Sequence, residues 1–373
     1  MMNTIRGHLL IEDSFVDGEI TFGKTIEKIT PGPVNADAPY VIPGFIDLHI
    51  HGSAGFDMTT GNPEDTIGTG TFLPTCGVTT FMPTTLSATP EESVRIIKGM
   101  TEGMRALPSC AADAPGLHLE GPFLHPDMMG AQPDFPHPAD RAVLEALLDA
   151  GPVKIMTLAP EIDPEGILLE GLRAGGVRHQ IAHSAATTAQ AKKAIIQDGY
   201  GITHLYNAMT GTHHRDENGK QAGVIGAALA YAEEAEIIAD GVHLSAEALL
   251  TAVRAIPKLY IVTDASAGAG APEGTYTLGG QTITKKHDRT LKPDGGLAAS
   301  ALRMDDALVW LVSLGIDLAK AAVLTSGHAA QVMGWDDRGR LAVGTRGDLL
   351  TCDGAGHLQA VYLAGQEIAP RGR

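Results

Sequence analysis

The sequence predicts an α/β protein, a (β/α)8 TIM-like barrel with a small β-sandwich domain formed by both termini. Short apolar runs alternate with helical patterns along the chain, which is typical of βα units in a parallel sheet. Histidine and acidic residues stand where several of these runs end. At 373 residues the chain exceeds the roughly 250 residues of a typical barrel, so a small second domain is expected as well.

Eight apolar runs are predicted to be the barrel strands. They are Val41–His49, Gly77–Pro83, Gly116–Glu120, Val153–Ala159, Val177–His183, Gly201–His204, Glu236–Asp240 and Leu259–Asp264. The helices predicted between them include Pro90–Leu107, Ala139–Ala150, Pro164–Ala174 and Thr188–Asp198. Several of these begin with the Thr, Asp or Pro residues that favour a helix start.

The two ends of the chain have a different pattern from the middle. Met1–Ala38 and Arg340–Arg373 alternate short strand patterns with glycine turns, and Tyr276–Arg289 does the same. We assign the two ends to one small β domain, residues 1–42 and 338–373. Residues 43–337 are assigned to the barrel.

Composition excludes several classes of partner. The formal net charge of -17 with no compensating basic run disfavours nucleic acid and anionic membrane surfaces. The most apolar later stretch, Ala307–Ile316, is half the ~20 residues that a membrane-spanning helix needs, and the first residues lack a signal-peptide core. Three widely separated cysteines fit neither a disulfide framework nor a thiolate zinc site, so a reducing cytoplasm is expected.

The candidate site residues lie at the C-terminal ends of predicted strands, which is the active-site face of such a barrel. They are His49, His51, Glu120, His183, His204 and Asp264. His49 and His51 are two apart on a strand and therefore point the same way. Neutral imidazoles with a carboxylate suit Zn²⁺ and similar divalent ions, and an incomplete protein shell leaves a position for catalytic water.

Each of these residues also has a structural interpretation. A single histidine near a strand end is more often structural than a ligand, but four at successive strand ends favour a metal site. Asp264 could cap a turn, since Ala265 and Ser266 follow it, but its place after an apolar strand favours a general base. His118, two residues before Glu120, is interpreted as supporting the site. Four further histidines are interpreted as loop or surface residues without a role: His125, His137, His179 and His328.

Several segments resemble the N-acetylglucosamine-6-phosphate deacetylases of the amidohydrolase superfamily. The segments are PGFIDLHIHG (Pro43–Gly52), GLHLEGPF (Gly116–Phe123), AHS (Ala182–Ser184), THLYNAM (Thr203–Met209), ADGVH (Ala239–His243), VTDA (Val262–Ala265), ASALRMDDA (Ala299–Ala307) and GRLAVGTRGDLL (Gly339–Leu350). They cover nearly the whole chain. HLEGPF and THLYNAM together are far more specific than the histidines alone.

The resemblance implies a set of roles. Glu120, His183 and His204 would hold the main metal, most simply Zn²⁺, and Asp264 would be the catalytic acid/base. Because some relatives lack the two histidines of the first strand, a second metal site at His49 and His51 stays open here. The implied substrate contacts are Ala131, Asn207, Ala208, Arg215, His243, Leu297, Ala298 and Ala299. Family likeness also implies a homodimer.

Two positions depart from the family pattern. Many relatives carry a histidine after the pair at Gly130–Ala131 that helps to polarise the amide carbonyl, whereas this chain has Gln132. The loop around Arg215 reads HHRDENG (His213–Gly219) in place of the usual Gly-Arg-Glu-Pro-Gly. We therefore expect carbonyl polarisation to depend more on the metal, and the phosphate contact to keep its arginine in an altered setting.

The expected reaction is removal of the N-acetyl group from N-acetylglucosamine 6-phosphate, a small-molecule amino-sugar phosphate. Alternatives are the galactosamine epimer, or cyclic-amide opening as in dihydroorotase or hydantoinase, where a carboxylated lysine on strand four bridges two metals. Lys154 is the only lysine in that run and lies near its start, away from the catalytic face. A non-catalytic binding barrel should have lost ligands, whereas this chain keeps the full set.

Overall fold

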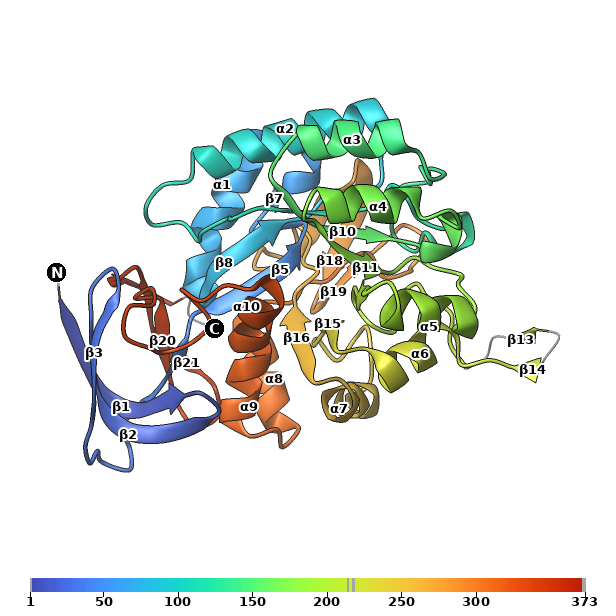
Figure 1. Ribbon diagram of the computed structural model, residues 1–373. Helices are drawn as coiled ribbons and strands as arrows, with labels where there is room; N and C mark the ends of the chain where they lie inside the picture. Colours follow the sequence, from blue (N-terminus) through green and yellow to red (C-terminus); the bar gives the residue numbers. More distant parts are fainter. Residues whose placement is uncertain (1, 213–214, 217–218, 371–373) are drawn as a thin grey trace.

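The computed structural model describes residues 2–212, 215–216 and 219–370, with the side chains of residues 215 and 216 left out. Parallel strands occupy the centre and helices surround them (Figure 1). The central strands are β5 (Phe45–Ile50), β8 (Val78–Pro83), β9 (Leu117–Glu120), β10 (Val153–Leu158), β11 (Arg178–Ile181), β12 (Gly201–Ile202), β15 (Glu234–Ile238) and β16 (Lys258–Val262). Each lies within or overlaps one of the eight predicted runs, so the predicted strand order is confirmed.

The central strands form three parallel groups, β5–β8, β9–β10–β11–β12 and β15–β16. Isolated bridges join neighbouring groups, Thr84 to His118 and Ile50 to Ala265. Within the described residues the ladders do not form one continuous ring, so the closed barrel stays a prediction. Every residue of β5 and β8 is buried, as expected for parallel strands covered on both faces.

The helices cover the outside of the central strands (Figure 1). They are α1 (Pro63–Phe72), α2 (Pro90–Arg105), α3 (Arg141–Asp149), α4 (Ile167–Ala174), α5 (Thr188–Ile196), α6 (Gly223–Tyr231), α7 (Ala246–Ala255), α8 (Met304–Ser313), α9 (Leu318–Ala322) and α10 (His328–Met333). The start of α2 shows the sequence logic: Thr89 accepts a hydrogen bond from the Glu92 amide and Pro90 occupies the first turn. Within the described residues, no helix is both long enough and apolar enough to cross a membrane.

Both ends of the chain build one seven-stranded sheet, in the order β22-β21-β20-β4-β1-β2-β3. Its strands are β1 (Asn3–Ile11), β2 (Ser14–Phe22), β3 (Ile26–Pro31), β4 (Tyr40–Pro43), β20 (Leu349–Cys352), β21 (Leu358–Leu363) and β22 (Gln366–Ile368). The N-terminal strands, blue, and the C-terminal strands, red, lie together beside the central strands (Figure 1). Phe22, Val41 and Leu349 are among the residues of its own buried apolar cluster. The sandwich form of this region stays a prediction.

The predicted first strand, Val41–His49, is wrong in its extent. The structure divides it at Gly44 into β4, which joins the terminal sheet, and β5, which pairs with β8. Gly44 lies so close to Thr79 that an added Cβ would meet the Thr79 hydroxyl at 2.3 Å. A side chain is excluded there, and glycine allows the chain to pass from one sheet to the other.

Smaller strands complete the fold. They are β6 (Gly52–Ser53), β7 (Phe56–Asp57), β13 (Arg215–Asp216), β14 (Gly219–Lys220), β17 (Gly274–Leu278), β18 (Gln281–Lys286) and β19 (Arg289–Leu291). β17, β18 and β19 form an antiparallel sheet that overlaps the predicted strand region Tyr276–Arg289 and extends beyond it at both ends. Leu278 and Ile283 of this sheet pack with Leu86 and Ala299, which fixes it beside the ends of the central strands.

Candidate active site

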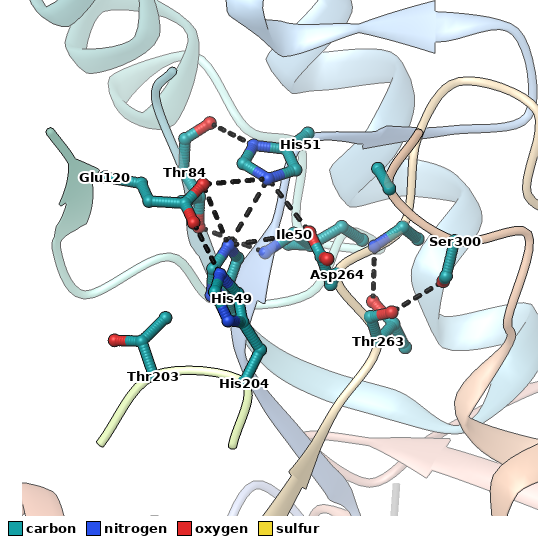
Figure 2. Close-up of polar contacts among 12 residues, drawn as sticks. His49, Ile50, His51, Thr84, Glu120, Thr203, His204, Thr263, Asp264 and Ser300 are labelled. Carbon is teal, nitrogen blue, oxygen red and sulfur yellow. Dashed lines mark hydrogen bonds and ion pairs between the residues drawn. The ribbon is translucent and has the colours of Figure 1, made fainter. Parts of the chain in front are cut away.

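The ends of the central strands bring the predicted site residues together. His49 lies in β5 and Glu120 ends β9, while His183, His204 and Asp264 each follow the last residue of a strand by two positions. All five are buried. Figure 2 shows His49, His51, Glu120, His204 and Asp264 pointing toward one another.

Three of these residues have an unusual backbone. The φ angles of His183, His204 and Asp264 are 47°, 28° and 48°. Residues other than glycine rarely adopt positive φ, and each such residue costs of order 1–3 kcal/mol. The left-handed turn directly after each strand directs these side chains across the strand ends.

Glu120 lies at the centre of the site. Its Oε1 atom is 3.0 Å from His183 Nε2 and 2.8 Å from His204 Nε2. Its Oε2 atom is 3.5 Å from His49 Nε2 and 3.4 Å from His51 Nε2. One carboxylate thus contacts four imidazoles, so it can bridge two positions for a cation.

His49, His51 and Asp264 form the second position. The Nε2 atoms of the two histidines are 3.3 Å apart, and Asp264 Oδ1 lies 3.0 Å from His51 Nε2 and 3.6 Å from His49 Nε2. In this group, and in that of Glu120, His183 and His204, the potential ligand atoms lie within 4.8 Å of one another. Each group can hold a metal ion.

The hydrogen bonds behind the imidazoles fit such an ion. His51 Nδ1 lies 3.2 Å from the Thr84 carbonyl oxygen, and His183 Nδ1 lies 2.7 Å from the Met128 carbonyl oxygen. Because a carbonyl only accepts, Nδ1 must carry a proton in both rings, so in the neutral ring the Nε2 lone pair faces the site and can bind an ion. Nitrogen lone pairs combined with carboxylate oxygens are the donors that borderline divalent ions prefer.

The same contacts control the charge of the carboxylates. Burial raises the pKa of Glu120, but the imidazoles of His49, His183 and His204 outweigh it and hold the pKa well below its usual range. Burial opposes ionisation of Asp264 as well, yet His51 and His49 lower its pKa. Both side chains therefore favour the carboxylate form, which can bind a cation or accept a proton.

A pocket of about 260 Å³ opens onto these residues. Of the predicted substrate contacts, Ala131, Asn207, Ala208, His243, Leu297 and Ala299 line it. Ala298 is buried beside it with 1% exposure, and its carbonyl oxygen accepts from Thr290. The Arg215 side chain lies outside the described residues. Lys292 also lines the pocket and donates to the Gly130 carbonyl oxygen at 3.2 Å, a contact that the sequence analysis missed.

His243 is held in place by its neighbour Asp240, since its Nδ1 lies 2.7 Å from Asp240 Oδ2. Burial lowers the pKa of His243, but the Asp240 carboxylate outweighs it and raises the pKa above the usual range. The imidazole therefore brings positive character to the pocket wall.

Gln132 is tied into the site at both ends of its amide. Its nitrogen donates to Glu120 Oε2 at 2.6 Å, and its oxygen accepts from the Ser87 amide at 2.7 Å. The side chain is therefore used to orient Glu120.

Two further histidines, His118 and His328, are buried. Both nitrogens of His118 face buried partners, the Leu48 carbonyl oxygen at 3.0 Å and Thr157 Oγ1 at 2.8 Å, so this ring supports β9 from inside. His328 was predicted in a loop or on the surface, and this is wrong. It begins α10, is only 8% exposed, and its Nδ1 lies 2.7 Å from the Leu259 carbonyl oxygen. Lys154, the lysine considered for the cyclic-amide alternative, is exposed at the start of β10.

Glu236 is the second residue that the sequence analysis missed. It lies in β15, is fully buried, and its Oε2 is 3.0 Å from His49 Nδ1. The sequence feature that could have identified Glu236 is an acidic residue inside a predicted strand whose neighbouring positions are apolar. Such a residue is almost never fully buried unless it is paired.

Comparisons with known proteins identify the family of the chain. Residues 40–369 match the amidohydrolase family. The chain is 32% identical to N-acetylgalactosamine-6-phosphate deacetylase of Escherichia coli O157:H7, over 96% of this chain and 97% of that protein. It is 33% identical to N-acetylglucosamine-6-phosphate deacetylase of Bacillus subtilis, over 90% of this chain and 86% of that protein.

A solved structure is similar over nearly the whole chain. It is an aspartate-to-alanine variant of N-acetyl-D-glucosamine-6-phosphate deacetylase from Mycobacterium smegmatis, in complex with N-acetyl-D-glucosamine-6-phosphate. The TM-score is 0.88 at 26% identity, covering 98% of this chain and 99% of that chain. The chain therefore belongs to the amidohydrolase family and, within it, to the N-acetylglucosamine-6-phosphate deacetylases.

Proposed function

We propose that this protein hydrolyses the N-acetyl group of N-acetylglucosamine 6-phosphate to give glucosamine 6-phosphate and acetate. The observation that carries the proposal is the position of Asp264, 3.0 Å from His51 in the pocket that Glu120, His183 and His204 also line. A carboxylate beside a group of metal-binding donors is what a hydrolase needs to activate water. The names of the relatives supply the substrate class.

Glu120, His183 and His204 would hold the main ion, and His49 and His51 a second. Histidine nitrogen with carboxylate oxygen favours Zn²⁺. A bound divalent ion supplies a Lewis acid that lowers the pKa of water and stabilises the charge that develops on the amide oxygen.

Asp264 moves the proton. As an anion it accepts a proton from the attacking water through Oδ1 or Oδ2, and the oxygen of that water then bonds to the acetyl carbon. The protonated carboxyl group returns this proton to the sugar nitrogen, so the carbon–nitrogen bond breaks with a neutral amine leaving. One carboxylate thus serves first as base and then as acid.

The pocket wall would bind the sugar. Asn207, Ala208, His243, Ala131 and the segment 297–299 are proposed to position the ring. Arg215 is proposed to bind the phosphate, because guanidinium forms paired hydrogen bonds with phosphate oxygens. A protein of net charge -17 needs such local donors to accept a dianion.

The architecture is proposed on the same basis. The eight central strands of residues 43–337 would close into a barrel, and residues 1–42 and 338–373 would form the small β domain. We also propose a homodimer, in keeping with the family likeness, which light scattering after gel filtration would test. A cytoplasmic location is supported by three cysteines that are all free.

The galactosamine epimer is the second candidate substrate. It is favoured by the 32% identity to the E. coli O157:H7 protein, which is named for N-acetylgalactosamine 6-phosphate. The two sugars differ only in the configuration at C4, so the pocket wall decides between them.

Acetate release should be measured for both N-acetylated sugar 6-phosphates and for the two unphosphorylated sugars. We expect the highest kcat/KM for N-acetylglucosamine 6-phosphate and loss of activity after chelation, with recovery on adding Zn²⁺. A higher kcat/KM for the galactosamine epimer would move the assignment to the second candidate. No acetate from any of the four by a metal-loaded protein would refute the proposal.

A further inference from the structure

Glu236 is a buried carboxylate with a defined set of partners. It is 0% exposed in β15. Its Oε2 lies 3.0 Å from His49 Nδ1, and its Oε1 accepts from the Tyr260 hydroxyl at 3.2 Å. Each carboxylate oxygen is therefore directed at a different group among the central strands.

This contact decides which nitrogen of His49 is free. An ionised carboxylate only accepts, so His49 Nδ1 must carry the proton that it donates to Glu236. In the neutral ring the Nε2 atom then keeps its lone pair, and this atom lies 3.3 Å from His51 Nε2 and 3.6 Å from Asp264 Oδ1 (Figure 2). Glu236 thus prepares His49 as a metal ligand.

The other histidines of the site are supported differently. His51 and His183 donate to backbone carbonyl oxygens, and His204 Nδ1 has no hydrogen-bond partner among the described residues. A carboxylate behind a metal-binding imidazole fixes the ring and raises its basicity. Among these four imidazoles, His49 is the one with a charged side chain behind it.

We propose that Glu236 is a positioning residue that makes His49, His51 and Asp264 a high-affinity site for a second divalent cation. This deepens the proposed function, and it rests on that proposal in treating the pocket as metal-dependent. The alternative is that Glu236 only stabilises the interior of the fold through Tyr260.

Metal titration of the full-length chain separates these two interpretations. The protein is stripped with a chelator and titrated with Co²⁺, whose visible absorption reports each occupied site, and bound metal is counted by mass spectrometry. We expect the wild type to bind two ions. Glu236→Gln should bind the first ion normally and the second about 10- to 100-fold more weakly, the usual effect of losing such a partner.

Two matched variants serve as controls. Glu234→Gln makes the same chemical change in the same strand, at a residue that pairs with Arg178 away from the site, and should bind both ions like wild type. Tyr260→Phe removes the other hydrogen bond of Glu236 but keeps its carboxylate, and should leave the second affinity within about twofold. If Glu236→Gln is too unstable to titrate, Tyr260→Phe compared with Glu236→Asp gives the same test, with the second affinity weakened only in Glu236→Asp.

A wild type that saturates with one ion would overturn the inference, and so would a Glu236→Gln variant that binds both ions with wild-type affinity. Equal weakening of both sites would likewise assign Glu236 to general stability. The titration contains no sugar, so its outcome is independent of deacetylation. If wild type released no acetate while Glu236→Gln still lost only its second ion, the proposed function would fail and this inference would stand.

Discussion

Replacing Asp264 by asparagine should separate proton transfer from folding and from binding of the main ion. Asparagine has nearly the same shape and tolerates positive φ, so the backbone at φ 48° can be kept. The amide cannot accept a proton from water at neutral pH. Loss of a general base typically reduces the rate by about 10²–10⁴-fold, which is about 2.7–5.4 kcal/mol in the barrier.

The structure also limits the accompanying change in stability. Asp264 Oδ1 lies 3.0 Å from His51 Nε2 and 3.6 Å from His49 Nε2, and only the first contact is within hydrogen-bond distance. A hydrogen bond to a charged group contributes about 1.5–3 kcal/mol, and the amide retains part of it. The free energy of unfolding should therefore fall by less than about 3 kcal/mol, so the variant remains folded.

The measurements are kcat/KM for acetate release, metal content and a denaturant melt, made on the same preparation. We expect a kcat/KM at least about 10²-fold lower, with metal content at Glu120, His183 and His204 unchanged. A folded, metal-loaded Asp264→Asn protein with near-normal kcat would show that another group takes the proton. Loss of all bound metal would show instead that Asp264 is needed to hold the main ion.

Three further predictions test other parts of the structure. His204→Asn should abolish both activity and binding of the main metal ion, whereas His49→Asn should still bind one ion. Bound metal is counted by mass spectrometry. A metal-free His49→Asn protein would show that the main site lies elsewhere. Arg215→Ala should raise KM about 10- to 100-fold for the phosphorylated sugar, because a charged hydrogen bond to the phosphate is lost. The KM for the unphosphorylated sugar should stay unchanged. Equal effects on both sugars would show that Arg215 does not bind the phosphate. Gly99→Ala should lower stability by about 1–3 kcal/mol through overpacking, since its Cβ would meet a backbone oxygen of a facing loop at 1.8 Å. The matched Gly175→Ala, with 3.4 Å clearance, should change a denaturant melt little, and equal melts would refute the clash.

The order of the strands and the convergence of the histidines could be predicted because both depend on local pattern. His183 and His204 are one βα unit apart, and successive parallel strands bring their C-terminal ends to the same edge. The partner of His49 could not be predicted. Glu236 reaches it across the interior, from a strand that is distant in sequence, and periodicity does not specify such a contact. Lys292 was missed for a similar reason, since its place in the pocket depends on how the β17–β19 sheet packs.

The seven-stranded sheet has a consequence for the order in which the chain can fold during synthesis. In β4, Val41 pairs with Leu9 on one side and with Thr351 on the other. β1, which contains Leu9, leaves the ribosome before β4 does. β20, which contains Thr351, follows only after every central strand has been made. Until then one edge of β4 presents unpaired N–H and C=O groups, which are a template for pairing with another chain. A chain that stops short of β20 should therefore aggregate through this edge, even though all the residues of the site are present.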